Sequence, residues 1–294
     1  MGNYSIKELE RLSGIKAHTI RIWEKRYQLI EPSRSDTNIR SYNDGQLKKI
    51  LNVSSLVALG YKISKISQMN PDEITSILEE NQRSILEDNN TDVTIHQLIK
   101  HAIDFNEKEL DDLINQIISQ SSLVDAFTEI LFPVLNRIGF LWTANKITPA
   151  HEHFMSHKVK QLLYASMSVG KNTESTDLKY LLFLPQWEEH EILLLFCNYL
   201  LKKNGMTTIY LGSRVPLENL IETIKDTQPI ALVSILTTPN YISEFKKYQK
   251  KITQTNPEIK SILGGAEVYK TQLSQLPNVT WVDNTPEFLS LINV

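Results

Sequence analysis

Apolar residues recur with a helical period through about the first 170 residues, and short strand-like runs separated by helical stretches follow to the end of the chain. The first helical stretch is short, with Ile6, Leu9 and Leu12 on one face. Gly14 permits a tight turn after it, because glycine adopts positive φ without strain. A second helix is predicted over residues 17–27. The chain therefore opens with two short helices joined by a turn, which predicts a helix-turn-helix.

The second helix is apolar on its inner side and basic on its outer side. A capping box of Ser5 and Glu8 starts the helix before it. Pro32 and the polar residues 33–38 predict a hairpin wing, and helical signals resume at Asn43-Asp44. This order predicts a winged helix-turn-helix that binds double-stranded DNA with its second helix in the major groove. The side chains expected to contact DNA are His18, Thr19, Arg21, Lys25, Arg26, Arg34 and Arg40.

The distribution of charge supports a nucleic-acid module at the start of the chain. Residues 1–75 hold twelve Lys/Arg and eight Asp/Glu, a net charge of +4, whereas the rest holds nineteen and twenty-six, a net charge of −7. The single cysteine, Cys197, excludes an internal disulfide and a multi-cysteine zinc site, which favours the cytoplasm. No apolar run is long enough to span a bilayer, so we expect no membrane partner.

The middle of the chain predicts a four-helix bundle. Four apolar stripes of helical period lie between residues 91 and 170, and Thr148-Pro149 is a typical start for the last of these helices. Polar residues gather there as His151-Glu152-His153. His153 and His157 stand four apart on one helical face, which would suit a metal ion, but hydrated histidines near a helix end are the commoner explanation.

The last part of the chain predicts a parallel α/β domain. Five buried strands alternate with helices, the first of which is predicted from about Glu189 to Lys203. This alternation indicates a flavodoxin-like, doubly wound sheet that binds ligands beyond the carboxyl ends of its strands. The fold class is therefore multi-domain, α and α/β. The predicted parts are a winged helix-turn-helix (1–75), a linker (76–90), the helical bundle (91–172) and the α/β domain (173–294).

Three carboxyl-end loops of this sheet carry candidate ligand-binding residues. Glu188-Glu189-His190 follows the first strand, and a carboxylate next to an imidazole can orient the ring as a metal ligand. Ser234 and Leu236 end a later strand, and Gly264-Gly265 end the next, where missing side chains let a ligand approach the backbone. Each residue alone also suits an ordinary loop or strand end. The chain has no glycine-rich phosphate-binding motif.

The predicted winged helix-turn-helix, residues 1–75, is called the head below, and it resembles the MerR family of transcriptional regulators. The matching stretches include Tyr4–Leu9, Thr19–Glu24, Arg26–Ile30 and Ile39–Tyr42. The resemblance implies a dimer on a pseudo-palindromic operator, with Tyr42 joining the arginines of the wing in contacting DNA. The long dimer helix of many members is missing, because Pro71 and the polar residues up to Asn90 interrupt the pattern. We therefore expect the homo-oligomer to form through the acidic remainder of the chain after the head, which is called the body below.

The body resembles cobalamin-binding proteins. Their sequence pattern begins with an acidic residue, a His two positions later and a Gly three positions after the His, and continues with Ser-x-Leu and Gly-Gly. This chain matches the pattern at every position except Leu193, which stands where Gly is expected. The resemblance implies that His190 is the lower ligand of the cobalt. The residues implied to bind cobalamin in this domain are Glu188, His190, Ser234, Leu236, Gly264 and Gly265.

The bundle adds a second motif. Trp142, nine further residues and Glu152-His153 resemble the pattern of light-sensing MerR regulators of the CarH/LitR group. The resemblance implies adenosylcobalamin, with these three residues covering its upper group, and a repressor whose assembly changes in light. Thr143 stands where that group can carry a His. Two alternatives stay open, namely a regulator of this architecture that has lost cobalamin or senses another ligand, and a corrinoid carrier or methyltransferase module. The leading interpretation is a regulator, so we expect the chain not to be an enzyme; a methyltransferase module would need a partner catalytic domain, for which the chain has no room.

Overall fold

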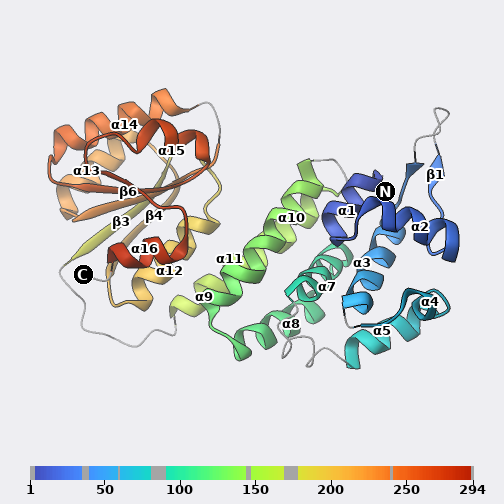
Figure 1. Ribbon diagram of the computed structural model, residues 1–294. Helices are drawn as coiled ribbons and strands as arrows, with labels where there is room; N and C mark the ends of the chain where they lie inside the picture. Colours follow the sequence, from blue (N-terminus) through green and yellow to red (C-terminus); the bar gives the residue numbers. More distant parts are fainter. Residues whose placement is uncertain are drawn as a thin grey trace. The chain divides into compact units, whose positions relative to one another are not determined.

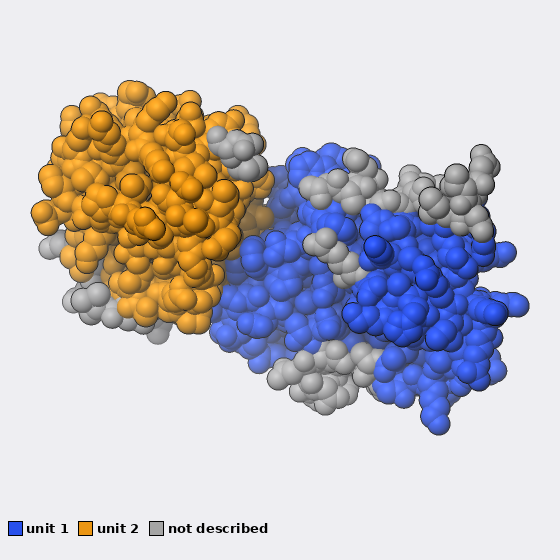
Figure 2. All heavy atoms as spheres, turned by 45° about the horizontal axis from the view of Figure 1, so that its top comes forward, with its two compact units in different colours: residues 1–157 blue, residues 158–294 orange. Residues whose placement is uncertain are grey.

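The computed structural model describes residues 4–34, 40–58, 60–80, 91–143, 147–168, 178–238 and 241–292. The chain divides into two compact units, Met1–His157 and Lys158–Val294, each with its own core (Figures 1 and 2). The first unit holds the predicted head and most of the bundle, and the second holds the α/β domain. No helix within these described ranges is both long and apolar enough to cross a membrane.

The head folds as the sequence predicts. The capping box at its first helix is present, with the Glu8 amide donating to the Ser5 hydroxyl and the Ser5 amide donating to the Glu8 carboxylate. Gly14 ends that helix with a φ of 73°, a left-handed conformation that favours glycine. The elements are α1 (Ile6–Ser13), α2 (Ala17–Tyr27), β1 (Ser33–Arg34), β2 (Arg40–Ser41), α3 (Asp44–Ala58), α4 (Ile63–Ile66) and α5 (Pro71–Glu80).

Helix α5 continues into the predicted linker, of which residues 81–90 lie outside the described part of the chain. The two strands of the wing pair antiparallel, and the tip between them, residues 35–39, also lies outside it. A bridge between Tyr4 and Tyr42 ties the start of the chain to the end of the wing. Both tyrosines are buried.

The middle of the chain is helical throughout its described residues. The third predicted helix differs from expectation, because a π-helical stretch interrupts it before α10 begins. Pro149 opens the last helix, and the amide of His151 donates to the carbonyl of Thr148 just before it. The elements are α7 (Thr91–Asp104), α8 (Glu107–Gln120), α9 (Leu123–Asp125), the π-helix η1 (Ala126–Leu131), α10 (Phe132–Thr143) and α11 (Pro149–Ser168).

The second unit is built on a parallel five-stranded sheet of order β4-β3-β5-β6-β7, which is the predicted flavodoxin-like topology. Helices cover both faces, with α13, α14 and α15 on one and α12 and α16 on the other (Figure 1). The strands are β3 (Lys179–Pro185), β4 (Thr207–Val215), β5 (Ala231–Leu236), β6 (Lys260–Gly265) and β7 (Val279–Trp281). The helices are α12 (Ile192–Lys203), α13 (Leu217–Thr227), α14 (Ile242–Thr255), α15 (Glu267–Leu273) and α16 (Thr285–Ile292).

Helix α12 starts later than predicted. We expected it from about Glu189, but it begins at Ile192. The residues in between form a tight turn, because the backbone amides of Glu189 and His190 donate to the side chain of Glu188 instead of entering the helix. This turn lies where the strand order reverses, since β3 pairs with β4 on one side and with β5 on the other.

Candidate functional sites

The recognition helix α2 presents a basic surface. His18, Arg21, Lys25 and Arg26 are exposed and Thr19 is half-buried, whereas the apolar side of the helix is buried. Long cationic side chains on one exposed helix face are suited to phosphate oxygens and to the edges of guanine in the major groove. The arrangement that the sequence predicts for α2 is therefore present.

The wing residues have partners inside the head. The guanidinium of Arg40 donates to Glu24 Oε2 at 3.1 Å, and the buried hydroxyl of Tyr42 donates to Oε1 of the same carboxylate. Burial, followed by the hydrogen bond to Glu24, raises the pKa of Tyr42. Glu24 thus ties α2 to the second strand of the wing. Arg34 is exposed on the first strand. The sequence did not reveal the role of Glu24, because nothing in its spacing marks a contact with β2.

The predicted residues of the bundle lie on α10 and at the start of α11, within the first unit. Trp142 is on α10 with 40% of its surface exposed. Glu152 and His153 are in the first turn of α11, where Oε2 of the acid and Nδ1 of the imidazole lie 2.7 Å apart. The His153 and His157 rings lie 6.3 Å apart. Among the residues described, no three His, Cys, Asp or Glu side chains are placed to hold a metal ion.

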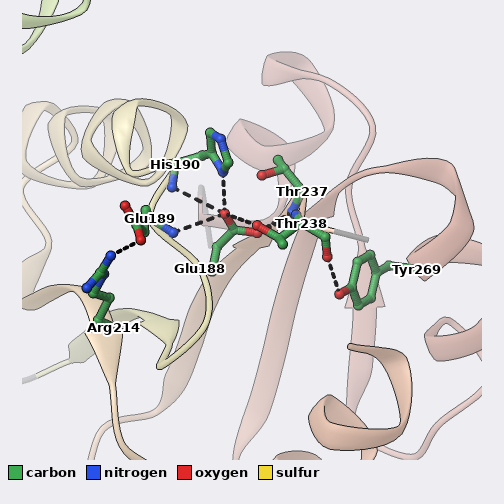
Figure 3. A network of polar contacts seen from close by, with 7 residues as sticks. All are labelled: Glu188, Glu189, His190, Arg214, Thr237, Thr238 and Tyr269. Atoms are coloured by element: carbon green, nitrogen blue, oxygen red, sulfur yellow. Dashed lines mark hydrogen bonds and ion pairs between the residues drawn. The ribbon is translucent and has the colours of Figure 1, made fainter. Parts of the chain in front are cut away.

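Glu188 is the centre of a polar network at the carboxyl ends of β3 and β5 (Figure 3). Its side chain is fully buried. Oε2 accepts hydrogen bonds from the backbone amides of Thr237 and Thr238, at 2.7 and 2.6 Å. Oε1 accepts from the Thr238 hydroxyl at 2.9 Å and from the amides of Glu189 and His190 at 3.1 and 3.2 Å. The buried carboxylate therefore joins the loops that follow two adjacent strands.

This network keeps Glu188 ionised. Burial alone would raise its pKa, but the hydrogen bonds from His190, Thr238 and Thr237 outweigh burial and lower the pKa to about 2. Nδ1 of His190 lies 2.6 Å from Oε1. An ionised carboxylate only accepts, so we assign a proton to Nδ1, and in the neutral tautomer that this leaves the lone pair is on Nε2. The side chain of His190 is 66% exposed. The pair is thus an oriented imidazole of the kind that ligates metals.

The other predicted residues of this domain gather along β5 and β6. Leu236 pairs with Gly265, and Gly264 pairs with the residue before Leu236. Ser234 is fully buried, and among the residues described its hydroxyl finds no hydrogen-bond partner. An orphaned buried hydroxyl fits a site that a polar ligand atom completes. The structure therefore brings Glu188, His190, Leu236 and the glycine pair to one edge of the sheet.

Several contacts of this edge were not predicted from the sequence. Thr237 and Thr238 hold Glu188, and the Tyr269 hydroxyl in turn donates to the Thr238 carbonyl at 2.6 Å. Arg214 forms an ion pair with Glu189 on the other side of the loop (Figure 3). A pair of polar residues directly after a strand at the switch point is the only sequence signal that could have suggested the two threonines.

Two features bear on the size of a ligand here. Leu193, which stands where the cobalamin pattern expects glycine, is half-buried in the first turn of α12. Trp187 stacks on Tyr241 with ring centroids 5.1 Å apart and planes 10° apart. Both fill space near the Glu188 loop that smaller side chains would leave open.

Two family models match the chain. Residues 4–73 match the MerR HTH family regulatory protein, and residues 94–165 match the B12 binding domain. The second match lies on the helical middle of the chain and covers Trp142, Glu152 and His153.

Three similar proteins match different shares of the chain. The HTH-type transcriptional repressor CarH of Myxococcus xanthus is 26% identical over 74% of this chain and 73% of its own length. The HTH-type transcriptional regulator MlrA of Escherichia coli is 32% identical over 24% of this chain and 28% of its own. The monomethylamine corrinoid protein of Methanosarcina barkeri has the same fold over 66% of this chain and 94% of its own, with a TM-score of 0.56 and 17% identity.

Proposed function

Because the chain is a MerR-type helix-turn-helix transcriptional regulator that carries a B12-binding domain, we propose that it is a repressor whose assembly on DNA is controlled by bound cobalamin. The observation that carries the cobalamin part is the Glu188–His190 pair, since a buried carboxylate fixes the tautomer of an exposed imidazole at the switch point of the sheet. The relative from Myxococcus xanthus is named as a repressor, which supports that sign of regulation.

We propose a role for each residue of the cofactor site. His190 would ligate the cobalt through Nε2, and Glu188 would hold the ring in place. Ser234, Leu236 and the Gly264-Gly265 pair would line the space for the cofactor's nucleotide base. Trp142 and Glu152-His153 would contact an organic group carried by the cobalt, for which adenosyl is our first choice. The orphaned hydroxyl of Ser234 supports this assignment, because a nitrogen or hydroxyl of the ligand would satisfy it.

The test of cofactor and light control is a purification in the dark with added adenosylcobalamin. We expect the protein to retain the chromophore through gel filtration and to elute at a larger size in the dark than after green light. The absorption spectrum and the elution volume give both results from one sample. A protein that elutes without chromophore, at a size that light leaves unchanged, contradicts cobalamin control.

A second candidate is a regulator of the same architecture that binds another ligand. The half-buried Leu193 and the Trp187–Tyr241 stack favour it, because a leucine stands where the cobalamin pattern has glycine and bulky rings adjoin the loop that carries His190. Replacing Leu193 by Gly separates the two candidates. If cobalamin is retained only by the Leu193→Gly variant, the site has the cobalamin geometry but is closed to it in the natural chain.

DNA binding is tested by the Arg21→Ala variant. The probe is a duplex selected in vitro with the wild-type chain. We expect the affinity of the variant for this duplex to fall about tenfold or more, because Arg21 is exposed on α2 and can form a bidentate contact to guanine there. Lys108→Ala is the matched control, since this exposed bundle lysine removes the same charge far along the chain. Equal affinities of the two variants would show that α2 does not face the bases as proposed.

A further inference from the structure

The end of helix α1 is held partly from outside the head. The last carbonyls of a helix lack partners within it and must find other donors. The Leu9 carbonyl accepts from the Ser13 hydroxyl, the Glu10 carbonyl from the Gly14 amide, and the Ser13 carbonyl from the Ser54 hydroxyl of α3. These donors belong to the head. The Leu12 carbonyl accepts from a guanidinium 125 residues away, that of Arg137 on α10.

Arg137 is itself held in place. One of its terminal nitrogens lies 3.4 Å from the Leu12 carbonyl and the other lies 2.9 Å from Asp92 on α7. Its side chain is 26% exposed. A cation at the C-terminus of a helix interacts favourably with the negative end of the helix dipole. The guanidinium thus joins α1, α7 and α10 in the last turn of α1, just before the chain leads into α2.

A second contact line runs between α3 and α7. Lys48 on α3 forms an ion pair with Asp104 on α7. The head therefore contributes one cation to its contacts with the bundle, Lys48, and the bundle contributes another, Arg137. Asn52 lies one turn from Lys48, and Gln97 and His101 lie one to two turns from Asp104. Within the described residues, buried atoms of these three side chains have no hydrogen-bond partner. An ion pair can be rehydrated when two helices separate, so it opposes their separation less than apolar packing does.

We propose that Arg137 is a positioning residue for DNA binding, which holds the turn between α1 and α2 on the helical bundle and so sets the orientation of the recognition helix. The docked head leaves His18, Arg21 and Lys25 exposed, so docking is compatible with DNA contact and does not block it. The inference rests on the proposed function in one respect, namely that several heads act together on one operator. In such an assembly, once one head has bound its half-site, a second head in a fixed orientation has a higher effective concentration at the other half-site than a freely rotating head would have.

The experiment compares full-length wild type with Arg137→Gln, Arg137→Lys and Lys108→Gln, the last of which removes an equal charge from an exposed site on α8. Hydrogen exchange is followed without DNA. We expect Arg137→Gln to speed exchange of the amides of residues 15–21 about tenfold while those of α8 are unchanged, and Arg137→Lys to restore part of the protection. Unchanged exchange in residues 15–21, or an equal increase in α8, overturns the proposal.

The same variants are then titrated with two selected duplexes, one with both half-sites and one with a single intact half-site. The advantage of the second half-site is the ratio of the affinity for the duplex with both half-sites to the affinity for the duplex with one. We expect Arg137→Gln to lose most of this advantage and to keep its affinity for the duplex with a single half-site. An advantage equal to that of wild type overturns the positioning role. A wild type without any such advantage contradicts the proposed assembly instead, and the exchange result then decides alone whether Arg137 holds the turn.

Discussion

Replacing Glu188 by Gln is expected to lower the free energy of unfolding of the α/β domain by about 3 kcal/mol. The amide offers one oxygen where the carboxylate offers two. Whichever way it is oriented, its NH₂ group faces two backbone N–H donors, those of Thr237 and Thr238 or those of Glu189 and His190. Buried donors are then left without acceptors. Urea denaturation followed by circular dichroism measures the change.

The matched control is the neighbouring residue. Glu189 pairs with Arg214, but both side chains are more than half exposed, at 59% and 63%. Exposed ion pairs contribute about 0 to 1 kcal/mol, so Glu189→Gln should unfold close to wild type. Equal losses in the two variants would show that Glu188 is not the residue that joins the β3 and β5 loops.

Glu188 also predicts a dependence of stability on pH. Its pKa in the folded chain is about 2, against an ordinary value of 4.5, so the unfolded chain binds the proton first as the pH falls. The stabilisation is therefore complete above pH 4.5 and is lost progressively towards pH 2, by about 3 kcal/mol in total. The Glu188→Gln variant should lack this component of the acid sensitivity.

Replacing Gly265 by Ala is expected to destabilise the same domain by about 3 kcal/mol or more. Gly265 has a φ of 122°, which L side chains rarely adopt. An added Cβ would lie 2.8 Å from the amide nitrogen and the carbonyl carbon of Leu236 and closer still to its oxygen. The paired end of β5 and β6 would have to separate. Thermal unfolding of the variant measures the effect.

Gly264 provides the comparison. Its added Cβ would lie 3.1 Å from the flexible end of Ile235 and 3.3 Å from the carbonyl of Val282, at an ordinary φ. We therefore expect Gly264→Ala to cost less than half as much as Gly265→Ala. The reverse order would show that the first glycine carries the tighter constraint. The second glycine thus has a structural reason to be present, whether or not a ligand approaches it.

The elements of the fold could be predicted where local signals agree. The bounds of α2 follow from its apolar period and from Gly14 before it, and the strand order follows from alternating strands and helices. The start of α12 was wrong because Glu188 takes the amides that would begin the helix. That competition depends on a carboxylate which the loop after β5 holds in place, and a local pattern does not contain it.

The candidate sites could be predicted only in part. Residue types and spacing marked Glu188 and His190, whose side chains meet in the structure. Their partners Thr237 and Thr238 contribute mainly backbone amides, which every residue except proline has, so their place directly after a strand is the only sequence signal for them. In the wing, the resemblance to the MerR family marked Tyr42 for DNA, but only the folded chain shows its hydroxyl on Glu24. The contact of Arg137 with Leu12 joins residues too distant in sequence for any pattern to predict.

The central claim is that a nitrogen of His190 binds the cobalt, and electron paramagnetic resonance of the Co(II) cobalamin complex tests it most directly. The chain is produced with nitrogen-15 histidine and unlabelled cofactor. If His190 is the lower ligand, the splitting from the axial nitrogen changes from three lines to two, and the His190→Ala variant loses the two-line pattern. A three-line pattern that persists in the labelled protein would mean that the cofactor's own base remains on the cobalt and would contradict the account.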